Sequence, residues 1–254
     1  MKVLVTNDDG IFSEGLEILV RYLVKYFDVS VVVPDGERSG SGHAITLLNP
    51  LRVRRVRHSP FDGIDAWMID GTPMDCVILA VDELVKDVSV VVSGVNNGFN
   101  LGDDVFHSGT VSAAMEGTLL GFPSVAVSTA PDGRNSFEIA ARVAHATVVH
   151  VLERGLPDMT FLNINVPQDA KGVQVTTQGR RRYVGKVHKY KDPRGLDCYW
   201  IGGKIEDEGE PGTDVYAVRN GFVSITPIKL DATDYALLNG LDELKKSVEK
   251  GYIA

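Results

Sequence analysis

The sequence predicts an α/β fold with a Rossmann-like, mostly parallel sheet and helices on both of its faces. Four short runs rich in β-branched residues are the first observation; they fall at residues 3–6, 29–33, 89–93 and 124–128. The segments between them are long enough to carry the crossover helices that parallel neighbours require. The second observation is that the chain turns glycine-rich, charged and aromatic after Val173, which favours hairpins. The fold class therefore adds a β-hairpin-rich C-terminal lobe and a closing helix.

Apolar residues that recur at helical spacing predict the helices. A first helix is expected over residues 13–26, a second from about Gly109 to Gly121, and a third over 137–153. A further strand is expected at 161–166. Arginines alternate with valines over 52–57, which indicates the exposed face of a strand, while contact with phosphate or a partner subunit stays open as an alternative.

A change in amino-acid composition near Lys171 suggests that the chain forms two structural units. Residues 1–170 are expected to form the Rossmann-like catalytic core. Residues 171–254 are expected to form a β-hairpin lobe up to about Pro227 and a closing helix over 235–250.

Composition limits the classes of partner. A net charge of −8 and a pI of about 5.3 argue against binding of a nucleic acid polymer, but they allow a nucleotide monomer. Cys76 and Cys198 are expected to be free thiols in a reducing compartment. The chain starts directly on a predicted strand and has no apolar run of about 18 residues. We therefore expect a cytoplasmic protein without a membrane span.

Two adjacent carboxylates follow the first predicted strand, in Asn7-Asp8-Asp9-Gly10. In parallel α/β sheets the ligand crevice lies outside the carboxyl ends of the strands, and neighbouring anions there are costly unless a cation neutralises them. The loop 34–43 and the segment 93–98 should reach the same rim. Carboxylate, hydroxyl and amide oxygens suit Mg²⁺ or Mn²⁺ better than zinc. The alternative is a polar turn in which Asp9 caps the next helix.

The segment Ser108-Gly109-Thr110 ends where a helix is expected to begin. Backbone N–H groups at a helix start, with two hydroxyls and a glycine that allows close approach, can bind phosphate. These three residues are therefore candidate phosphate ligands. Helix capping by Ser108 or Thr110 is the simpler alternative.

The chain resembles the SurE family of stationary-phase survival proteins, which are metal-dependent phosphatases of nucleoside monophosphates. The resemblance covers nearly the whole chain, in order, and its joint spacing makes it specific. It is carried by the segments 7–10, 37–40, 70–77, 93–96, 100–102, 108–111, 162–167, 212–214 and 223–227.

The resemblance implies one divalent metal ion per subunit, Mg²⁺ or Mn²⁺, held by Asp8, Asp9, Ser39 and Asn96. It implies hydrolysis of nucleoside 5′-monophosphates, in some members also 3′-monophosphates or short polyphosphate, with Asp8, Asp9 and Asn96 as catalytic residues. A cation there would activate a water for in-line attack. It also implies a homodimer or homotetramer, with contacts made by an extended hairpin and the C-terminal segment.

Several assignments stay open from the sequence alone. Each of His43 and His107 is either the acid that protonates the leaving oxygen or a packing residue. Asp103 and Asp104 form either a second metal site or a solvated loop. Tyr199 and Trp200 either stack on a base or fill an interface.

Other functions are less consistent with the sequence. A nucleotide sensor that uses the same site without turnover is the main alternative. A receiver domain would need an aspartate where Asn96 stands, and the chain has neither a Gly-x-Gly-x-x-Gly turn after its first strand nor a P-loop. These absences argue against a dinucleotide oxidoreductase and a P-loop ATPase.

Overall fold

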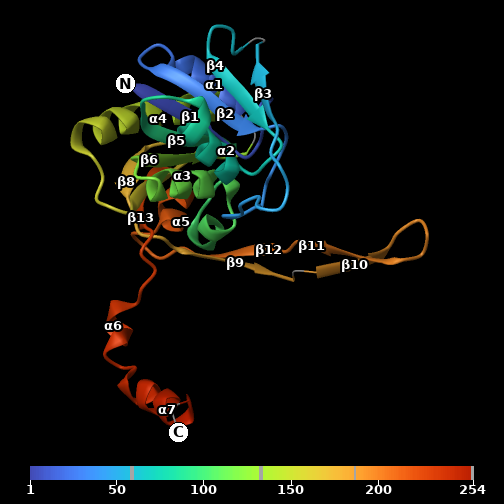
Figure 1. The fold of residues 1–254 in the computed structure, drawn as a ribbon, viewed down its shortest axis with the longest axis vertical. Helices are drawn as coiled ribbons and strands as arrows, with labels where there is room; N and C mark the ends of the chain where they lie inside the picture. Colours follow the sequence, from blue (N-terminus) through green and yellow to red (C-terminus); the bar gives the residue numbers. More distant parts are fainter. Residues whose placement is uncertain (58–59, 132–133, 186, 253–254) are drawn as a thin grey trace.

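The computed structural model describes residues 1–57, 60–131, 134–185 and 187–252, and within these it describes a nine-stranded sheet with helices on both faces (Figure 1). The parallel centre comprises β1 (Lys2–Thr6), β2 (Asp28–Pro34), β4 (Asp65–Ile69), β5 (Val88–Asn97), β6 (Ser124–Thr129) and β7 (Thr160–Val166). The outer strands are β3 (Val53–Val56), β13 (Phe222–Lys229) and β8 (Gly172–Val175). The order is β3-β4-β2-β1-β5-β6-β7-β13-β8. The predicted fold class is confirmed.

Successive residues of the central strands feed two separate cores. Val3 and Val5 face the cluster formed with α1 (Glu14–Leu23) and α4 (Arg134–Arg154). Leu4, between them, faces the cluster formed with α2 (Pro73–Leu79) and α3 (Gly109–Leu119). This alternation is the side-chain period of a strand, and it explains why near-continuous apolar runs form strands with both faces buried.

The predicted helices and strands differ from the structure mainly at their ends. Helix α1 stops at Leu23 and not at Tyr26; beyond it the N–H groups of Lys25 and Tyr26 bond to the carbonyls three residues back, those of Tyr22 and Leu23. The strand expected at 89–93 continues to Asn97. The elements that were not predicted include β4, α2 and α5 (Asp214–Arg219), which are five, seven and six residues long and so too short to show a repeated pattern.

The closing helix is two helices, α6 (Tyr235–Leu238) and α7 (Asp242–Tyr252), and not one. Asp234 caps α6 by accepting from the N–H groups of Ala236 and Leu237. Gly240 interrupts the expected helix, as glycine is a poor helix former. Neither helix contains a buried residue among those described, and both lie away from the body of the molecule (Figure 1).

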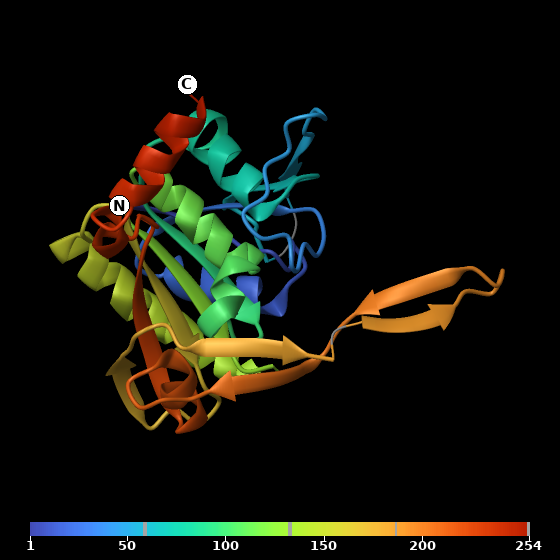
Figure 2. The same ribbon diagram turned by 90° about the horizontal axis from the view of Figure 1, so that it is seen from below.

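The hairpin comprises residues 180–208. Its inner half pairs β9 (Arg180–Val184) with β12 (Lys204–Glu208), and its outer half pairs β10 (Val187–Lys191) with β11 (Asp197–Ile201). It projects from the body in both ribbon views (Figures 1 and 2). Strands β8 and β13, which flank it, pair with the main sheet instead. Whether residues 1–170 and 171–254 behave as two units stays a prediction.

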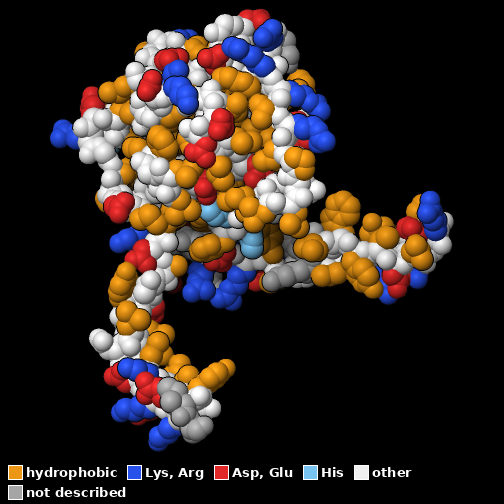
Figure 3. Space-filling view, viewed as in Figure 1, with side chains coloured by type: hydrophobic (Ala, Val, Ile, Leu, Met, Phe, Trp, Pro, Cys, Tyr) orange, Lys and Arg blue, Asp and Glu red, His pale blue; other side chains and the backbone are white. Residues whose placement is uncertain are grey.

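The hairpin and the C-terminal segment carry rows of exposed hydrophobic side chains (Figure 3). Trp200 is 66% exposed, Ile201 85% and Leu244 57%. The described residues include no helix long and apolar enough to span a bilayer.

Candidate active site

A cleft of about 400 Å³ lies at the carboxyl end of β1. Strand order reverses between β1 and β5, and such a switch point is where open α/β sheets bind ligands. Its lining includes all four predicted metal ligands, which come from three loops and strands: Asp8, Asp9, Ser39 and Asn96. The volume is within the range of small-molecule sites.

Local hydrogen bonds fix the turn that carries the two carboxylates. Asn7 accepts from the N–H of Gly10 at 3.1 Å and donates to its carbonyl at 3.0 Å. Gly10 has a φ of +88°, and a Cβ there would lie 3.0 Å from the backbone of Gly36. The carbonyl of Asp8 accepts from the N–H of Arg38 at 2.7 Å. The second loop is thereby held against the first, which brings Ser39 to the carboxylates.

Asp8 is held by the start of α3. Its carboxylate accepts from the hydroxyl and the N–H of Thr110. A Cβ on Gly109 would lie 2.8 Å from the Cβ of Asp8, so glycine is required for this close approach. Asp8 is only 4% exposed, and this burial raises its pKa despite the hydrogen bonds from Thr110.

The surroundings of Asp9 are suited to a carboxylate that binds a metal ion. Burial and the neighbouring charge of Asp8 raise its pKa to about 6. Among the described residues, its Oδ2 is buried without a hydrogen-bond partner. A divalent cation would satisfy this oxygen and offset the repulsion within the pair. The residues present therefore fit a bound metal ion.

Ser39 and Asn96 supply the remaining oxygens. The Ser39 hydroxyl donates to Glu37 at 2.9 Å, which leaves lone pairs on its oxygen. The Asn96 amide nitrogen donates to the carbonyl of Gly98 at 2.8 Å, so Oδ1 is the amide atom that remains for a cation. No three His, Cys, Asp or Glu side chains form a metal-binding group in the described parts of the chain, as expected for a set with only two carboxylates.

The three candidate phosphate ligands differ in their access to the cleft. Ser108 lines it, whereas Gly109 and Thr110 are not part of its lining. The Ser108 side chain also caps α3 by accepting from the N–H of Val111 at 3.1 Å. Thr110 is fully buried and hydrogen-bonded to Asp8. Phosphate binding by these residues stays a prediction, and the structure gives Thr110 a contact that the sequence did not indicate.

The two candidate histidines are separated by the structure. His107 lines the cleft. His43 does not, and its Nε2 lies 3.1 Å from the carboxylate of Glu116 on α3. His107 is therefore the better placed of the two to reach a leaving group.

Asp103 and Asp104 hold the root of the hairpin. Asp104 is 8% exposed and accepts from Arg181 at 2.9 Å and from the hydroxyl of Tyr183 at 2.7 Å. Asp103 accepts from the N–H of Arg181 at 3.2 Å. Both alternatives considered from the sequence, a second metal site and a solvated loop, fit these contacts poorly because the carboxylates already have partners within the protein.

Tyr199 and Trp200 lie in the outer half of the hairpin and are not among the residues that line the cleft. They are 60% and 66% exposed, and the Lys189 amine lies 5.5 Å from the centroid of the Tyr199 ring. Their exposure fits the interface alternative better than base stacking within the same subunit.

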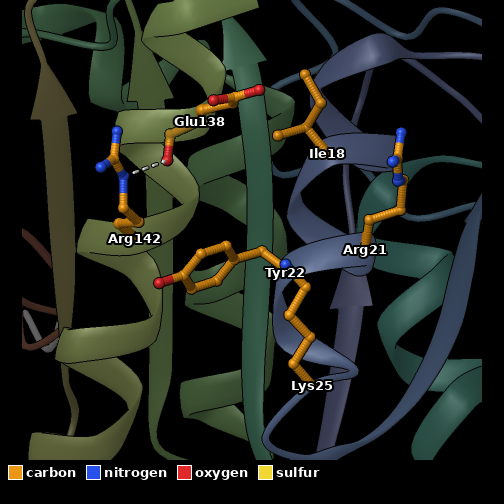
Figure 4. A pocket seen from close by; sticks show the side chains of 6 residues that line it. All are labelled: Ile18, Arg21, Tyr22, Lys25, Glu138 and Arg142. Atoms are coloured by element: carbon orange, nitrogen blue, oxygen red, sulfur yellow. Dashed lines mark hydrogen bonds between the residues drawn. The ribbon is translucent and has the colours of Figure 1, made fainter.

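A second groove, of about 360 Å³, lies between α1 and α4 (Figure 4). None of its lining residues also lines the cleft. Arg21 pairs with Glu17 at 3.3 Å, and Arg142 donates to the carbonyl of Glu138 at 3.3 Å. We assign it no function, because its cations are exposed or engaged and no set of groups converges in it.

Buried asparagines form a support that sequence reasoning missed. The carbonyl of Asn100 accepts from Asn163 at 2.9 Å and from Asn165 at 3.0 Å, and the Asn100 side chain donates to Ser128 at 2.8 Å. The sequence feature that could have indicated this cluster is the presence of two polar residues, Asn163 and Asn165, within the apolar predicted strand 161–166. The cleft also includes Phe99 and Tyr183, for which the sequence offered no periodic or motif signal.

Fold and cleft together define the class: a doubly wound α/β protein with a pair of carboxylates at its topological switch point. A family model described as "Survival protein SurE" matches residues 3–185. The chain belongs to the SurE family, which confirms the resemblance drawn from the sequence.

Relatives named "5′-nucleotidase SurE" align over nearly the full length of this chain. The one from Geobacter metallireducens is 49% identical, with 95% of this chain and 96% of the relative covered. The one from Legionella pneumophila strain Philadelphia 1 is 43% identical, with 98% of each chain covered. A crystal structure of the SurE protein from Aquifex aeolicus aligns with a TM-score of 0.82 at 41% identity, covering 96% of this chain and 100% of that chain.

Proposed function

We propose that this protein is a metal-dependent 5′-nucleotidase that hydrolyses nucleoside monophosphates to nucleoside and phosphate. The observation that carries the proposal is the pair of buried Asp8 and partly buried Asp9, with a buried Asp9 oxygen that has no hydrogen-bond partner among the described residues, in a cleft that also presents Ser39 and Asn96. Near full-length relatives that carry the name 5′-nucleotidase support it. Nucleoside 3′-monophosphates and short polyphosphate belong to the same chemistry and are included as further substrates.

Asp8, Asp9, Ser39 and Asn96 would hold one divalent ion, Mg²⁺ or Mn²⁺. The ion would neutralise phosphate charge and lower the pKa of an attacking water. Thr110 keeps Asp8 in place through its hydroxyl and N–H. Asn96 is oriented by its hydrogen bond to Gly98.

The phosphate would be bound beside the start of α3. Ser108, Gly109 and Thr110 provide the first turn of that helix and its N-cap, where the helix dipole favours an anion. Ser108 lines the cleft, and His107 beside it is the candidate that gives a proton to the departing nucleoside oxygen.

The test is phosphate release from nucleoside monophosphates with Mg²⁺, with Mn²⁺ and with chelator. Release should depend on the metal. Asp8→Asn should lower kcat/KM by at least about 100-fold, while Asp28→Asn, an exposed carboxylate at the start of β2, should leave it unchanged. Metal-dependent nucleotide binding without release would identify a sensor and contradict the proposal.

Self-association and location are part of the proposal. The exposed hydrophobic side chains of the hairpin and C-terminal segment are suited to contacts with further copies of the chain, as a homodimer or homotetramer. A cytoplasmic location is consistent with the free thiols of Cys76 and Cys198.

A further inference from the structure

We propose that Phe99 and Tyr183 form the subsite for the nucleobase of the substrate. The inference rests on the proposed nucleotidase function and adds the residues that bind the leaving group. Phe99 and Tyr183 are the only phenylalanine, tyrosine or tryptophan among the described residues that line the cleft. The rest of the lining includes carboxylates, amides and hydroxyls, which suit a metal ion and a phosphate.

Tyr183 is a ring fixed in position at the root of the hairpin. Its hydroxyl donates to Asp104 at 2.7 Å, and burial together with this bond raises its pKa to about 12. Asp104 is itself held by Arg181, whose guanidinium also pairs with Asp207 at 2.7 Å. The residue remains 37% exposed, so the side chain is held at its hydroxyl end while the residue is still accessible to a ligand.

Phe99 is also held in position, by its own packing contacts. It is half-buried and packs against Leu101, Val215 and Val218. The next residue, Asn100, is locked by the asparagine cluster, including an N–H donated to Asn165 at 2.8 Å. The part of the ring that lines the cleft therefore belongs to a side chain with little freedom to move.

Two aromatic side chains that are fixed in position offer a nucleobase a surface on which to stack. Stacking on an aromatic ring is available to every base, because each has a π face, and a ring that is ordered before binding avoids the entropy cost of ordering it. We therefore expect acceptance of purine and pyrimidine nucleotides, with tighter binding of the larger purines. Tyr199 and Trp200, the aromatic candidates from the sequence, are outside the cleft lining.

The experiment compares a nucleotide with the same sugar phosphate that lacks a base. Adenosine 5′-monophosphate and ribose 5-phosphate are assayed with Phe99→Leu, Tyr183→Leu and Tyr183→Phe. Each leucine variant should lower kcat/KM for the nucleotide by about 5- to 100-fold and change it less than about twofold for ribose 5-phosphate. Tyr183→Phe keeps the ring and should lose much less than Tyr183→Leu. Tyr26→Leu, an exposed tyrosine on the surface near α1, is the matched control.

Equal losses for both substrates, or no loss for the nucleotide, would overturn the inference. Calorimetric binding of adenosine tests it without turnover: wild-type protein should bind the nucleoside, and both leucine variants should bind it more weakly. If no phosphate is released from any substrate, the nucleotidase proposal fails while this binding measurement still decides the subsite. Unchanged adenosine affinity in both variants would contradict the subsite whatever the activity.

Discussion

Thr110→Val removes the hydroxyl that donates to Asp8 and keeps the shape of the side chain. The buried carboxylate then has one donor fewer, so we expect about 10-fold or more weaker metal binding, as for other partners of metal ligands. The measurement is the Mg²⁺ concentration for half-maximal activity. Thr118→Val is the control, because that hydroxyl donates to the carbonyl of Ala114 in the same helix. Similar changes in both variants, confined to Tm, would mean that Thr110 only stabilises the helix.

Asp8 and Asp9 make the stability of the metal-free protein depend on pH. Burial raises both pKa values, that of Asp9 from 3.8 to about 6. The folded state therefore holds these protons more tightly than the unfolded chain, so this contribution to stability grows as pH falls through about 6 and is lost as pH rises. We expect Mg²⁺ to raise Tm more at about pH 7.5 than at about pH 5. The double variant Asp8→Asn with Asp9→Asn should abolish the difference, and equal Mg²⁺ shifts in the wild type would contradict it.

Among the elements, the hairpin depends on a buried ion pair at its root. Arg181, Asp104 and Asp207 have side-chain exposures of 11%, 10% and 6%. Arg181→Leu removes the cation that two buried carboxylates share, which leaves Asp104 with Tyr183 and Asp207 with Arg219. Removing one partner of a buried ion pair typically costs about 3–5 kcal/mol. Lys189→Leu removes an exposed pair with Asp197 in the outer half and should cost less than about 1 kcal/mol. Chemical denaturation measures both, and equal losses would show that the root pair is not special.

The same elements show which features the sequence predicts. Long apolar strands such as β2 and a helix with a regular apolar face such as α1 are readable because their pattern repeats. The turn 7–10 can be predicted as part of a site because two adjacent carboxylates follow a strand at the edge of the sheet where ligands bind. The sequence does not predict Tyr183 as a residue of the cleft, because its position depends on a hydrogen bond to Asp104, 79 residues away in the chain. Such long-range contacts leave no local pattern.

The whole molecule consists of a compact body and two projecting segments. Because α6 and α7 bury no described residue, deletion of residues 232–254 should leave the circular dichroism of the body nearly unchanged. If these helices join subunits, sedimentation equilibrium should show a smaller assembly. Leu244→Ser with Val248→Ser should act in the same direction, and Lys245→Ser with Glu249→Ser is the matched control. An unchanged mass in the deletion variant would remove this segment from the subunit contacts.

The hairpin serves two regions at once, since its root contributes Tyr183 to the cleft and its outer half is exposed. A neighbouring subunit that holds the outer half would also limit how far the root can move. The turnover rate per subunit would then depend on enzyme concentration, falling on dilution as the assembly dissociates. Assays at low enzyme concentration would underestimate the activity, and a ligand of the hairpin tip would act as an inhibitor or activator without entering the cleft.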